Sequence, residues 1–256
     1  LLKYKHTFCI IYSKEANISL DRIIFHVDVN SAFLSWEATY RLHHLGGQVD
    51  LRKQISAVGG DMAMRHGIIL AKSIPAKKYH IKTGETIVEA RQKCPNLILV
   101  PPNYNLYEQC SKAFMNILKE YSPCVEQYSI DEAFVDMTET TNLWGDPLTA
   151  ATRLKNQIRD SLGFTVNIGI SENKLLAKMA SDFQKPDRSH SLWKKEIADK
   201  MWPLPVSDLL FVGKATTKKL LDLGIRSIGD LAHSDPALLK AHLKSTVKLS
   251  GPFLMV

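Results

Sequence analysis

The stretch Arg22-Ile-Ile-Phe-His-Val-Asp-Val29 decides how the fold begins. Its apolar side chains recur at every second position: Ile23, Phe25, Val27 and Val29. This period of two predicts a β-strand with one apolar face. Ser31 follows as a predicted N-cap, and the pattern after it predicts a helix over 32–44 that ends at Gly46-Gly47.

Further along the chain, helical and extended patterns follow in the order of a ferredoxin-like fold. Asn103 opens a helix whose apolar residues recur every three to four positions, and Pro123 ends it. The elements predicted after it are strands at 125–130 and 133–137, a helix at 148–161 and a strand at 164–170. The order strand, helix, strand, strand, helix, strand is ferredoxin-like, so we predict an α+β fold.

Three segments lie outside this pattern. Residues 55–100 contain two short apolar runs and a Lys-rich helical piece, which predicts a small mixed subdomain inserted into the fold. Residues 186–205 are interpreted as a connection with one short helix, and the chain from Val206 onward as helical. The first 20 residues show no clear period, and we interpret them as a tail or an upstream extension.

Composition limits the classes of protein to consider. The 256 residues predict two or three structural units, and a hydrophobic fraction of 45% excludes wholesale disorder. The net charge is 33 − 26 = +7; residues 1–150 carry 16 basic and 16 acidic side chains, and residues 151–256 carry 17 and 10. All of the excess is therefore C-terminal, as expected if that part binds a polyanion. No run of about 18 apolar residues and no C-x-x-C pair is present, so we expect a soluble, intracellular protein without a zinc knuckle.

The predicted topology can bring three carboxylates close together. Asp28 ends the first strand, and Asp131-Glu132 lies between the two strands of the central hairpin. The first and central strands of a ferredoxin-like sheet are neighbours, so the three acids can meet if the chain bends at 131–132. Converging carboxylates repel one another unless a cation lies between them, and Mg²⁺ prefers such oxygen ligands. Two Mg²⁺ ions at such a site would support phosphoryl transfer.

The alternative interpretation is that these acids are ordinary surface residues, as we expect for Asp136 and Glu139. Topology favours the functional interpretation for the trio Asp28, Asp131 and Glu132.

Three sequence blocks then show a resemblance to a known family. They are Asp28-Val-Asn-Ser-Ala-Phe33, Tyr128-Ser-Ile-Asp-Glu-Ala-Phe134 and Gly169-Ile-Ser-Glu-Asn-Lys-Leu-Leu-Ala-Lys178. In this order they resemble the signature blocks of Y-family translesion DNA polymerases of the bacterial DNA polymerase IV type. Arg65–Lys72 and Pro75–Tyr79 resemble the finger region of the same family, and the likeness extends from about Arg22 to His242.

The resemblance implies roles for the matching positions. Asp28, Asp131 and Glu132 would be the catalytic metal ligands, with the backbone carbonyl of Val29 beside them, and two Mg²⁺ ions would be the cofactors. Phe33 would be the steric gate that excludes a ribose 2′-hydroxyl; without the family blocks, we would interpret it as a core aromatic on a helix face. Lys77 and Lys185 would bind the triphosphate.

Some positions depart from the family pattern. Lys77 stands where an Arg is usual, so it keeps the charge and loses the bidentate fork. Ile74 stands where many relatives have a phosphate-binding Tyr, and Ser31 and Ala32 replace residues that are often aromatic. These departures leave the predicted metal site intact and alter the contacts to the nucleotide.

The segment Leu210-Phe-Val-Gly-Lys-Ala-Thr216 resembles a helix-hairpin-helix, whose turn directs backbone N–H groups at a DNA phosphate. Phe211 takes the place of the usual first glycine. The resemblance implies DNA-backbone contacts from four residues, although the lysines are equally well explained as a solvated helix face: Gly213, Lys214, Lys218 and Lys219.

The family fold implies a ferredoxin-like palm at 21–54 and 101–186, small fingers at 55–100 and a helical thumb at 187–256. Because residues 245–256 no longer resemble the family, we expect a truncated product or a fragment that lacks the family's little-finger domain, and hence low affinity and processivity. The implied activity is error-prone, template-directed addition of dNTPs to a primer.

The expected partners are primer-template DNA and dNTPs, with a sliding clamp as a candidate; we expect a cytoplasmic, nucleoid-associated bacterial monomer that does not bind membranes. Two other functions remain open. A nucleotidyl cyclase shares the palm but should lack the fingers and the basic thumb, and a truncated paralogue could bind DNA without turning over.

Overall fold

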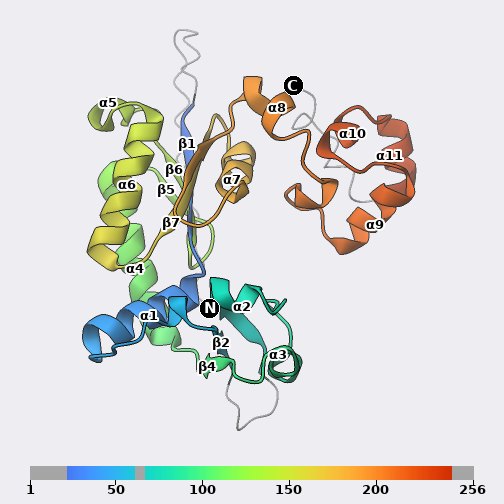
Figure 1. The fold of residues 1–256 in the computed structure, drawn as a ribbon. Coiled ribbons are helices and arrows are strands. Elements are labelled where there is room, and N and C mark those ends of the chain that lie inside the picture. The colour runs from blue at the N-terminus through green and yellow to red at the C-terminus, as the bar shows by residue number, and fades with distance from the viewer. Residues whose placement is uncertain (1–21, 61–66, 244–256) are drawn as a thin grey trace, which may run out of the picture.

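A computed structural model describes residues 22–60 and 67–243 of the chain. Its main sheet has the strand order β5-β6-β1-β7-β8, with β1 at the centre (Figure 1). The strands are β1 (Ile24–Val29), β5 (Val125–Gln127), β6 (Glu132–Asp136), β7 (Val166–Ser171) and β8 (Ser189–Ser191). β1 pairs antiparallel with both β6 and β7, and β8 pairs parallel with β7. The predicted α+β fold with a ferredoxin-like sheet is confirmed.

Helices cover both faces of this sheet. On one face lie α4 (Tyr104–Tyr121) and α6 (Pro147–Leu162) with α5 (Thr141–Trp144) beside them, and on the other lies α7 (Lys174–Asp182) (Figure 1). The helix α1 (Ala32–His44) lies across the end of the sheet that is next to the fingers (Figure 1). Because side chains alternate along a strand, Phe25 and Val27 enter the main core with α4 and α6, whereas His26 and Asp28 lie on the α7 side. Asp28, the acid predicted on β1, therefore lies on the α7 side of the sheet.

Gly169 allows α7 to lie close to the sheet. A Cβ atom at this position would stand 1.9 Å from the carbonyl oxygen of Ala177 and 2.4 Å from the backbone nitrogen of Ser181, both in α7. Only glycine permits this approach of helix to strand. The close packing brings Ser181 against β1, where it meets the predicted site.

The inserted fingers form a separate small layer. Their sheet has the order β3-β2-β4, built from β2 (Ser56–Gly59), β3 (Ile69–Lys72) and β4 (Ile98–Val100). The short helices α2 (Ile74–Lys77) and α3 (Ile87–Lys93) pack on it, and η1 (Leu51–Lys53) precedes it. These elements enclose their own core, which includes Ala57, Ile69, Ala76, Ile81 and Ala90.

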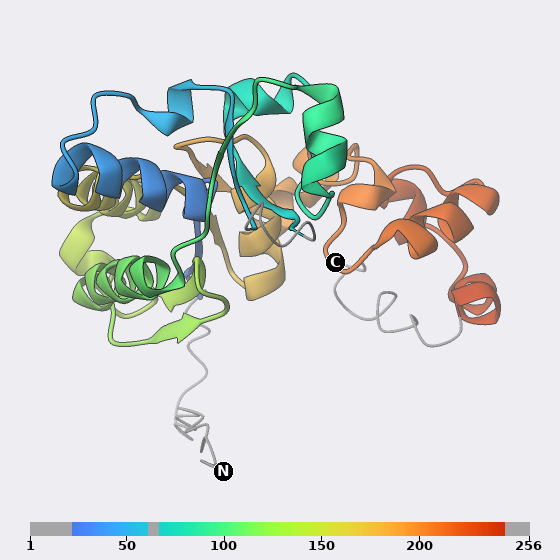
Figure 2. The ribbon, with the colours of Figure 1, turned by 90° about the horizontal axis from the view of Figure 1, so that it is seen from below.

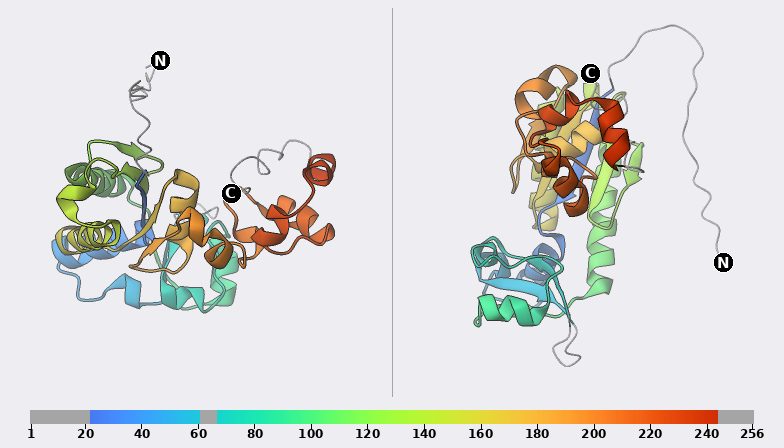
Figure 3. Two further views of the ribbon diagram at one scale, coloured as in Figure 1. Left: turned by 90° about the horizontal axis from the view of Figure 1, so that it is seen from above. Right: turned by 90° about the vertical axis from the view of Figure 1, so that its right-hand side faces the viewer.

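The thumb is helical and stands to one side of the palm, beyond α7 (Figures 2 and 3). It comprises η3 (Lys194–Glu196), α8 (Ile197–Lys200), η4 (Val206–Asp208), α9 (Lys214–Asp222), α10 (Ile228–Ala232) and α11 (Pro236–Leu243). Its core includes Leu176 and Met179 of α7, so this one helix packs against both palm and thumb. Within the described ranges, no helix is long and apolar enough to cross a bilayer.

One local prediction was correct in position only, and another was wrong. Ser31 occupies the N-cap position of α1, but its side chain caps nothing, because its backbone takes a left-handed conformation with φ 48°. The connection after residue 186 contains a strand, β8, which is too short and too polar to show a strand pattern. The predicted tail at 1–20 and the divergent end at 245–256 lie outside the described residues.

Candidate active site

The three predicted carboxylates come from the junction of β1 and β6. The register of the two strands sets Asp28 directly opposite Glu132. The Val29 N–H donates to the carbonyl of Asp131 over 3.0 Å, and the N–H groups of Tyr128 and Ser129 both donate to the carbonyl of Glu132. These bonds close a turn before β6, which is the bend that the sequence required. The backbone of all three acids is therefore fixed at one place.

Each carboxylate has a different set of partners. Asp28 is 7% exposed and forms an ion pair with Lys185, which also pairs with Asp182 over 2.7 Å. Glu132 accepts from His26 Nε2 at 3.2 Å and pairs with Lys178 at 3.1 Å. Two of the three acids are thus neutralised by lysines that follow the β7 strand in sequence.

Asp131 is different because no cation pairs with it among the described residues. Its carboxylate accepts one hydrogen bond, from the Ser129 hydroxyl at 2.8 Å. Burial, and after it the negative charges of Asp28 and Glu132, raise the pKa of Asp131. The hydrogen bond from His26, followed by Lys178, outweighs burial at Glu132 and lowers the pKa of that carboxyl to about 2. Negative charge at the site is therefore only partly compensated by the protein.

This donor set is compatible with a divalent cation. No group of three or more His, Cys, Asp or Glu side chains in residues 22–60 and 67–243 is arranged so that it could hold a metal ion. Asp28 pairs with Lys185, and Glu132 pairs with Lys178. The uncompensated, partly buried Asp131 carboxylate beside Asp28 offers the hard oxygen ligands that Mg²⁺ prefers. The carboxylates would have to release these lysines for all three to bind metal.

A cavity of about 1010 Å³ opens beside the junction, between palm and fingers. Asp28, Val29 and Asp131 line it from the palm, and Ile74 and Lys77 line it from the fingers. Its wall carries a group of basic side chains, namely Arg52, Lys53, Lys72, Lys77, Arg159 and Lys185. A cavity with acids at one end and cations around it suits an anionic ligand that also binds metal. Glu132 is not part of the cavity wall.

Phe33 lines the same cavity from the first turn of α1. Its ring stacks on Tyr107 of α4, with centroids 4.5 Å apart and an angle of 12° between the planes. The structure therefore brings Phe33, Lys77 and Lys185, predicted to bind nucleotide, to one cavity.

Sequence reasoning missed several residues at the site. His26 is fully buried and links Glu132 to Ser181 of α7, whose hydroxyl lies 2.8 Å from His26 Nδ1. Its position two residues before Asp28 on one strand puts both on the same face, and this signal could have identified it. Lys178 is the last residue of one of the three family blocks, but the sequence analysis gives it no role. No sequence signal connected Tyr107 to Phe33.

The predicted DNA-binding residues lie in the thumb, and none of them lines the cavity. Gly213 is the N-cap of α9, and Lys214, Lys218 and Lys219 are all exposed on that helix. Phe211, in place of the usual glycine, is 70% exposed and adopts φ 70°. The backbone at Phe211 is thus left-handed, a conformation that a residue with a bulky side chain does not favour.

Comparison with known proteins places these features in a family. Residues 27–182 match the sequence model of the impB/mucB/samB family, and residues 194–225 match that of the IMS family HHH motif. The chain is 52% identical over 227 residues to DNA polymerase IV of Clostridium acetobutylicum, covering 88% of the chain and 57% of that protein. It is 40% identical over 233 residues to DNA polymerase IV 1 of Bacillus subtilis, covering 91% and 53%. The chain thus spans just over half the length of these relatives.

Solved structures show the same fold. The crystal structure of DinB from Sulfolobus solfataricus superposes with a TM-score of 0.78 and 25% identity, covering 89% of the chain and 65% of that protein. An insertion ternary complex of Dbh DNA polymerase gives a TM-score of 0.76, also at 25% identity and with the same coverage.

Proposed function

The chain belongs to the impB/mucB/samB family, and from this premise we propose that it is the core of a template-directed DNA polymerase of the translesion type. It would add dNTPs to a primer 3′-hydroxyl by phosphoryl transfer. The single observation that carries the proposal is the 1010 Å³ cavity, whose wall joins Asp28 and Asp131 of the β1–β6 junction to basic side chains from both palm and fingers. The relatives named DNA polymerase IV support the same conclusion.

We propose that the acid end of the cavity holds the cofactor. Asp28, Asp131, Glu132 and the Val29 carbonyl would bind two Mg²⁺ ions, which when bound stabilise the attacking and leaving oxygens. The uncompensated charge at Asp131 supports this assignment. His26 and Lys178 would hold the Glu132 carboxylate in place until metal binds.

The basic wall would bind the triphosphate. Lys185 is close to the acids and remains charged. Burial acts to lower its pKa, but the carboxylates of Asp28 and Asp182 outweigh burial and raise that pKa. In the proposed reaction it exchanges Asp28 for a phosphate oxygen, and Lys77 binds the same triphosphate from the fingers. Phe33 would close the space where a ribose 2′-hydroxyl would lie. Catalysis then consists mainly of positioning and charge stabilisation.

The thumb would bind the duplex. Gly213 and Lys214 lie at the start of α9, where free backbone N–H groups suit a DNA phosphate, and Lys218 and Lys219 follow further along the helix. We propose the division into palm (21–54 and 101–186), fingers (55–100) and thumb (187–256). The separate core of the fingers supports it, as does the thumb core, which also includes Leu176 and Met179 of α7. β8 is an exception to these bounds, because it pairs in the palm sheet although it lies beyond residue 186.

The wider assignments are proposals of the same kind. We propose primer-template DNA and dNTPs as partners of a monomeric, cytoplasmic and nucleoid-associated protein, with a sliding clamp as a further partner. The small fingers support low fidelity and tolerance of damaged template.

Primer extension tests the function. The purified chain with Mg²⁺ should extend a primer on undamaged and abasic templates, and a variant with Asp28, Asp131 and Glu132 all changed to Ala should not. DNA binding without incorporation by the unmutated chain would instead identify a binding paralogue. Formation of a cyclic nucleotide from a triphosphate without DNA would identify a cyclase.

A further inference from the structure

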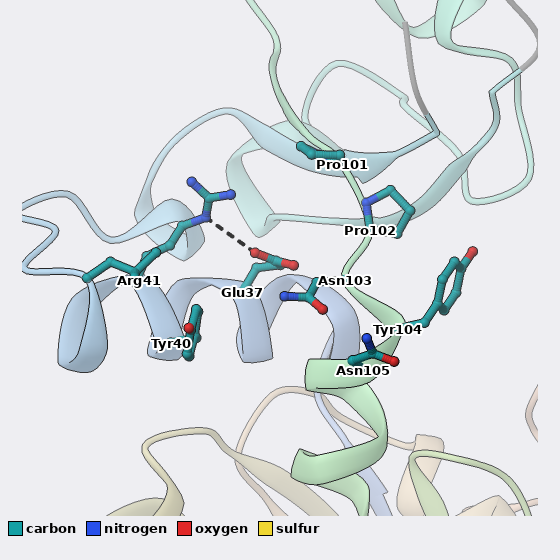
Figure 4. A pocket seen from close by; sticks show the side chains of 9 residues that line it. Glu37, Tyr40, Arg41, Pro101, Pro102, Asn103, Tyr104 and Asn105 are labelled. Atoms are coloured by element: carbon teal, nitrogen blue, oxygen red, sulfur yellow. Dashed lines mark hydrogen bonds and ion pairs between the residues drawn. The ribbon is translucent and has the colours of Figure 1, made fainter. Parts of the chain in front are cut away.

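Glu37 is a buried carboxylate that has no part in the proposed reaction. It lies on α1, one turn after Phe33, and is only 3% exposed. Its Oε1 accepts from the Tyr107 hydroxyl at 3.0 Å, and its Oε2 accepts from Arg41 Nε at 3.3 Å (Figure 4). A buried carboxylate is unfavourable unless it is paired and hydrogen-bonded, so both partners are needed to hold this group.

Tyr107 connects Glu37 to Phe33. Its ring is fully buried and stacks on Phe33, while Tyr104 meets it edge-on with centroids 5.9 Å apart. Burial, together with the adjacent Glu37 carboxylate, raises the pKa of the Tyr107 hydroxyl, so it remains a donor. Since Phe33 and Glu37 are four residues apart on α1, they contact the two ends of one tyrosine.

Packing alone does not confine Glu37. A second cavity, of about 570 Å³, lies beside it between α1 and the chain that returns from the fingers at Pro101 and Pro102 (Figure 4). Glu37 and Arg41 both line this cavity. With open space on this side, the carboxylate keeps its position through its two hydrogen bonds.

From this geometry we infer that Glu37 is a positioning residue for sugar selection: it fixes Tyr107, and Tyr107 supports the ring of Phe33 from behind. The inference rests on the proposed polymerase function. One face of Phe33 packs on Tyr107, and the side chain also lines the nucleotide cavity. If Tyr107 loses its anchor, both rings can shift, and the space that excludes a 2′-hydroxyl widens. A tight site for dNTPs needs this support from behind.

The test is the ratio of kcat/KM for a dNTP to that for the matching rNTP in primer extension. Tyr107→Phe keeps the stacked ring and removes only the hydrogen bond to Glu37. We expect the ratio to fall about three- to tenfold, the factor that corresponds to one net hydrogen bond. The fall should come from faster rNTP incorporation, while dNTP incorporation stays within about twofold.

Two matched variants sharpen the test. Tyr104→Phe removes an exposed hydroxyl from the same helix, and the ratio should stay at the unmutated value. Glu37→Gln keeps an acceptor for Tyr107 and should also retain most of the selectivity. If Tyr107→Phe does not fold, Glu37→Met removes the same hydrogen bond at similar volume.

The possible outcomes distinguish a failure of this inference from a failure of the proposed function. An unchanged ratio in Tyr107→Phe overturns the inference, as does an equal loss for both nucleotides, because a purely structural tyrosine would produce either. If the unmutated chain incorporates neither nucleotide, the proposed function fails, and the inference fails with it.

Discussion

The acids at the β1–β6 junction and the lysines of α9 meet their surroundings in opposite ways. Asp28 and Glu132 are paired with lysines and a histidine that come from distant parts of the chain. Lys214, Lys218 and Lys219 are exposed, and no ion pair joins them to any described residue. One region is fixed by register and burial, and the other presents solvated charge.

This difference determines how each region should respond to change. Buried groups that share partners act as a unit, so losing one has a large effect that does not add simply to the others. Solvated charges act separately, and each has a small effect that salt weakens. Substitutions at the junction should therefore have the largest effects, and substitutions on α9 the smallest.

The largest effect is expected from Asp131→Asn. Incorporation should fall by about a thousandfold or more, as it does when one member of a catalytic unit is removed. Stability should not fall with it. Because the folded state raises the pKa of Asp131, the ionised carboxylate is unfavourable above that pKa, and the neutral amide should keep or raise the melting temperature.

Asp136→Asn, at the far end of β6 from Asp131, is the matched control. Asp136 pairs with Arg22 over 2.7 Å and accepts from Thr138, away from the cavity. This variant should lower the melting temperature and leave incorporation intact. If the two variants behaved alike, the β1–β6 junction would have no special role.

A smaller effect should follow from Asp50→Asn at the edge of the cavity. Asp50 accepts from the backbone and guanidinium of Arg52, which also donates to the Gly163 carbonyl. Burial acts to raise the pKa of Asp50, but these bonds outweigh burial and lower that pKa. We expect a loss of about 1 kcal/mol at neutral pH, measured by urea unfolding.

The pH dependence of this loss has a definite sign. A carboxyl group with a lowered pKa stabilises the fold above its unfolded value of 3.8, and this stability disappears as the pH falls through the lowered pKa. The difference between Asp50→Asn and the unmutated chain should therefore shrink towards zero below that pH. A constant difference from pH 7 to pH 3 would contradict the charged interaction.

In the thumb, Phe211→Gly should stabilise the protein. Phe211 has φ 70° and is 70% exposed, so glycine removes backbone strain and loses little buried surface. We expect a gain of about 0.5–1 kcal/mol in the free energy of unfolding, measured by urea unfolding. Val212→Gly should do the reverse, because Val212 is 8% exposed and packs in the thumb core.

The smallest effects are expected from Lys218→Ala and Lys219→Ala. Each should weaken DNA binding about two- to threefold on any sequence, and the salt dependence should become less steep by about 0.9 for each phosphate that is no longer neutralised. Lys112→Ala removes an exposed lysine on α4 that pairs with Glu108, and binding should not change. A large loss of binding from either thumb lysine alone would remove the contrast with the palm.

Much of this architecture could be predicted from the sequence. The helix over 32–44 matches the prediction, and the helix that opens at Asn103 is capped by that residue, because local periodicity and capping are short-range properties. The junction of Asp28 with Asp131 and Glu132 also followed from the order of elements. The strand β8 did not, since three polar residues carry no pattern of their own and pair only because β7 is already in place.

The sequence by itself determined which elements form, which acids end them and where the excess positive charge lies. Only the tertiary structure decided which partner each acid meets. His26 and Glu132 are 106 residues apart, Asp28 and Lys185 are 157 apart, and Glu37 and Tyr107 are 70 apart. Such pairs arise from pairing β1 with β6 and from packing α7 on the sheet and α1 on α4, and no local pattern encodes contacts between residues so distant in the chain.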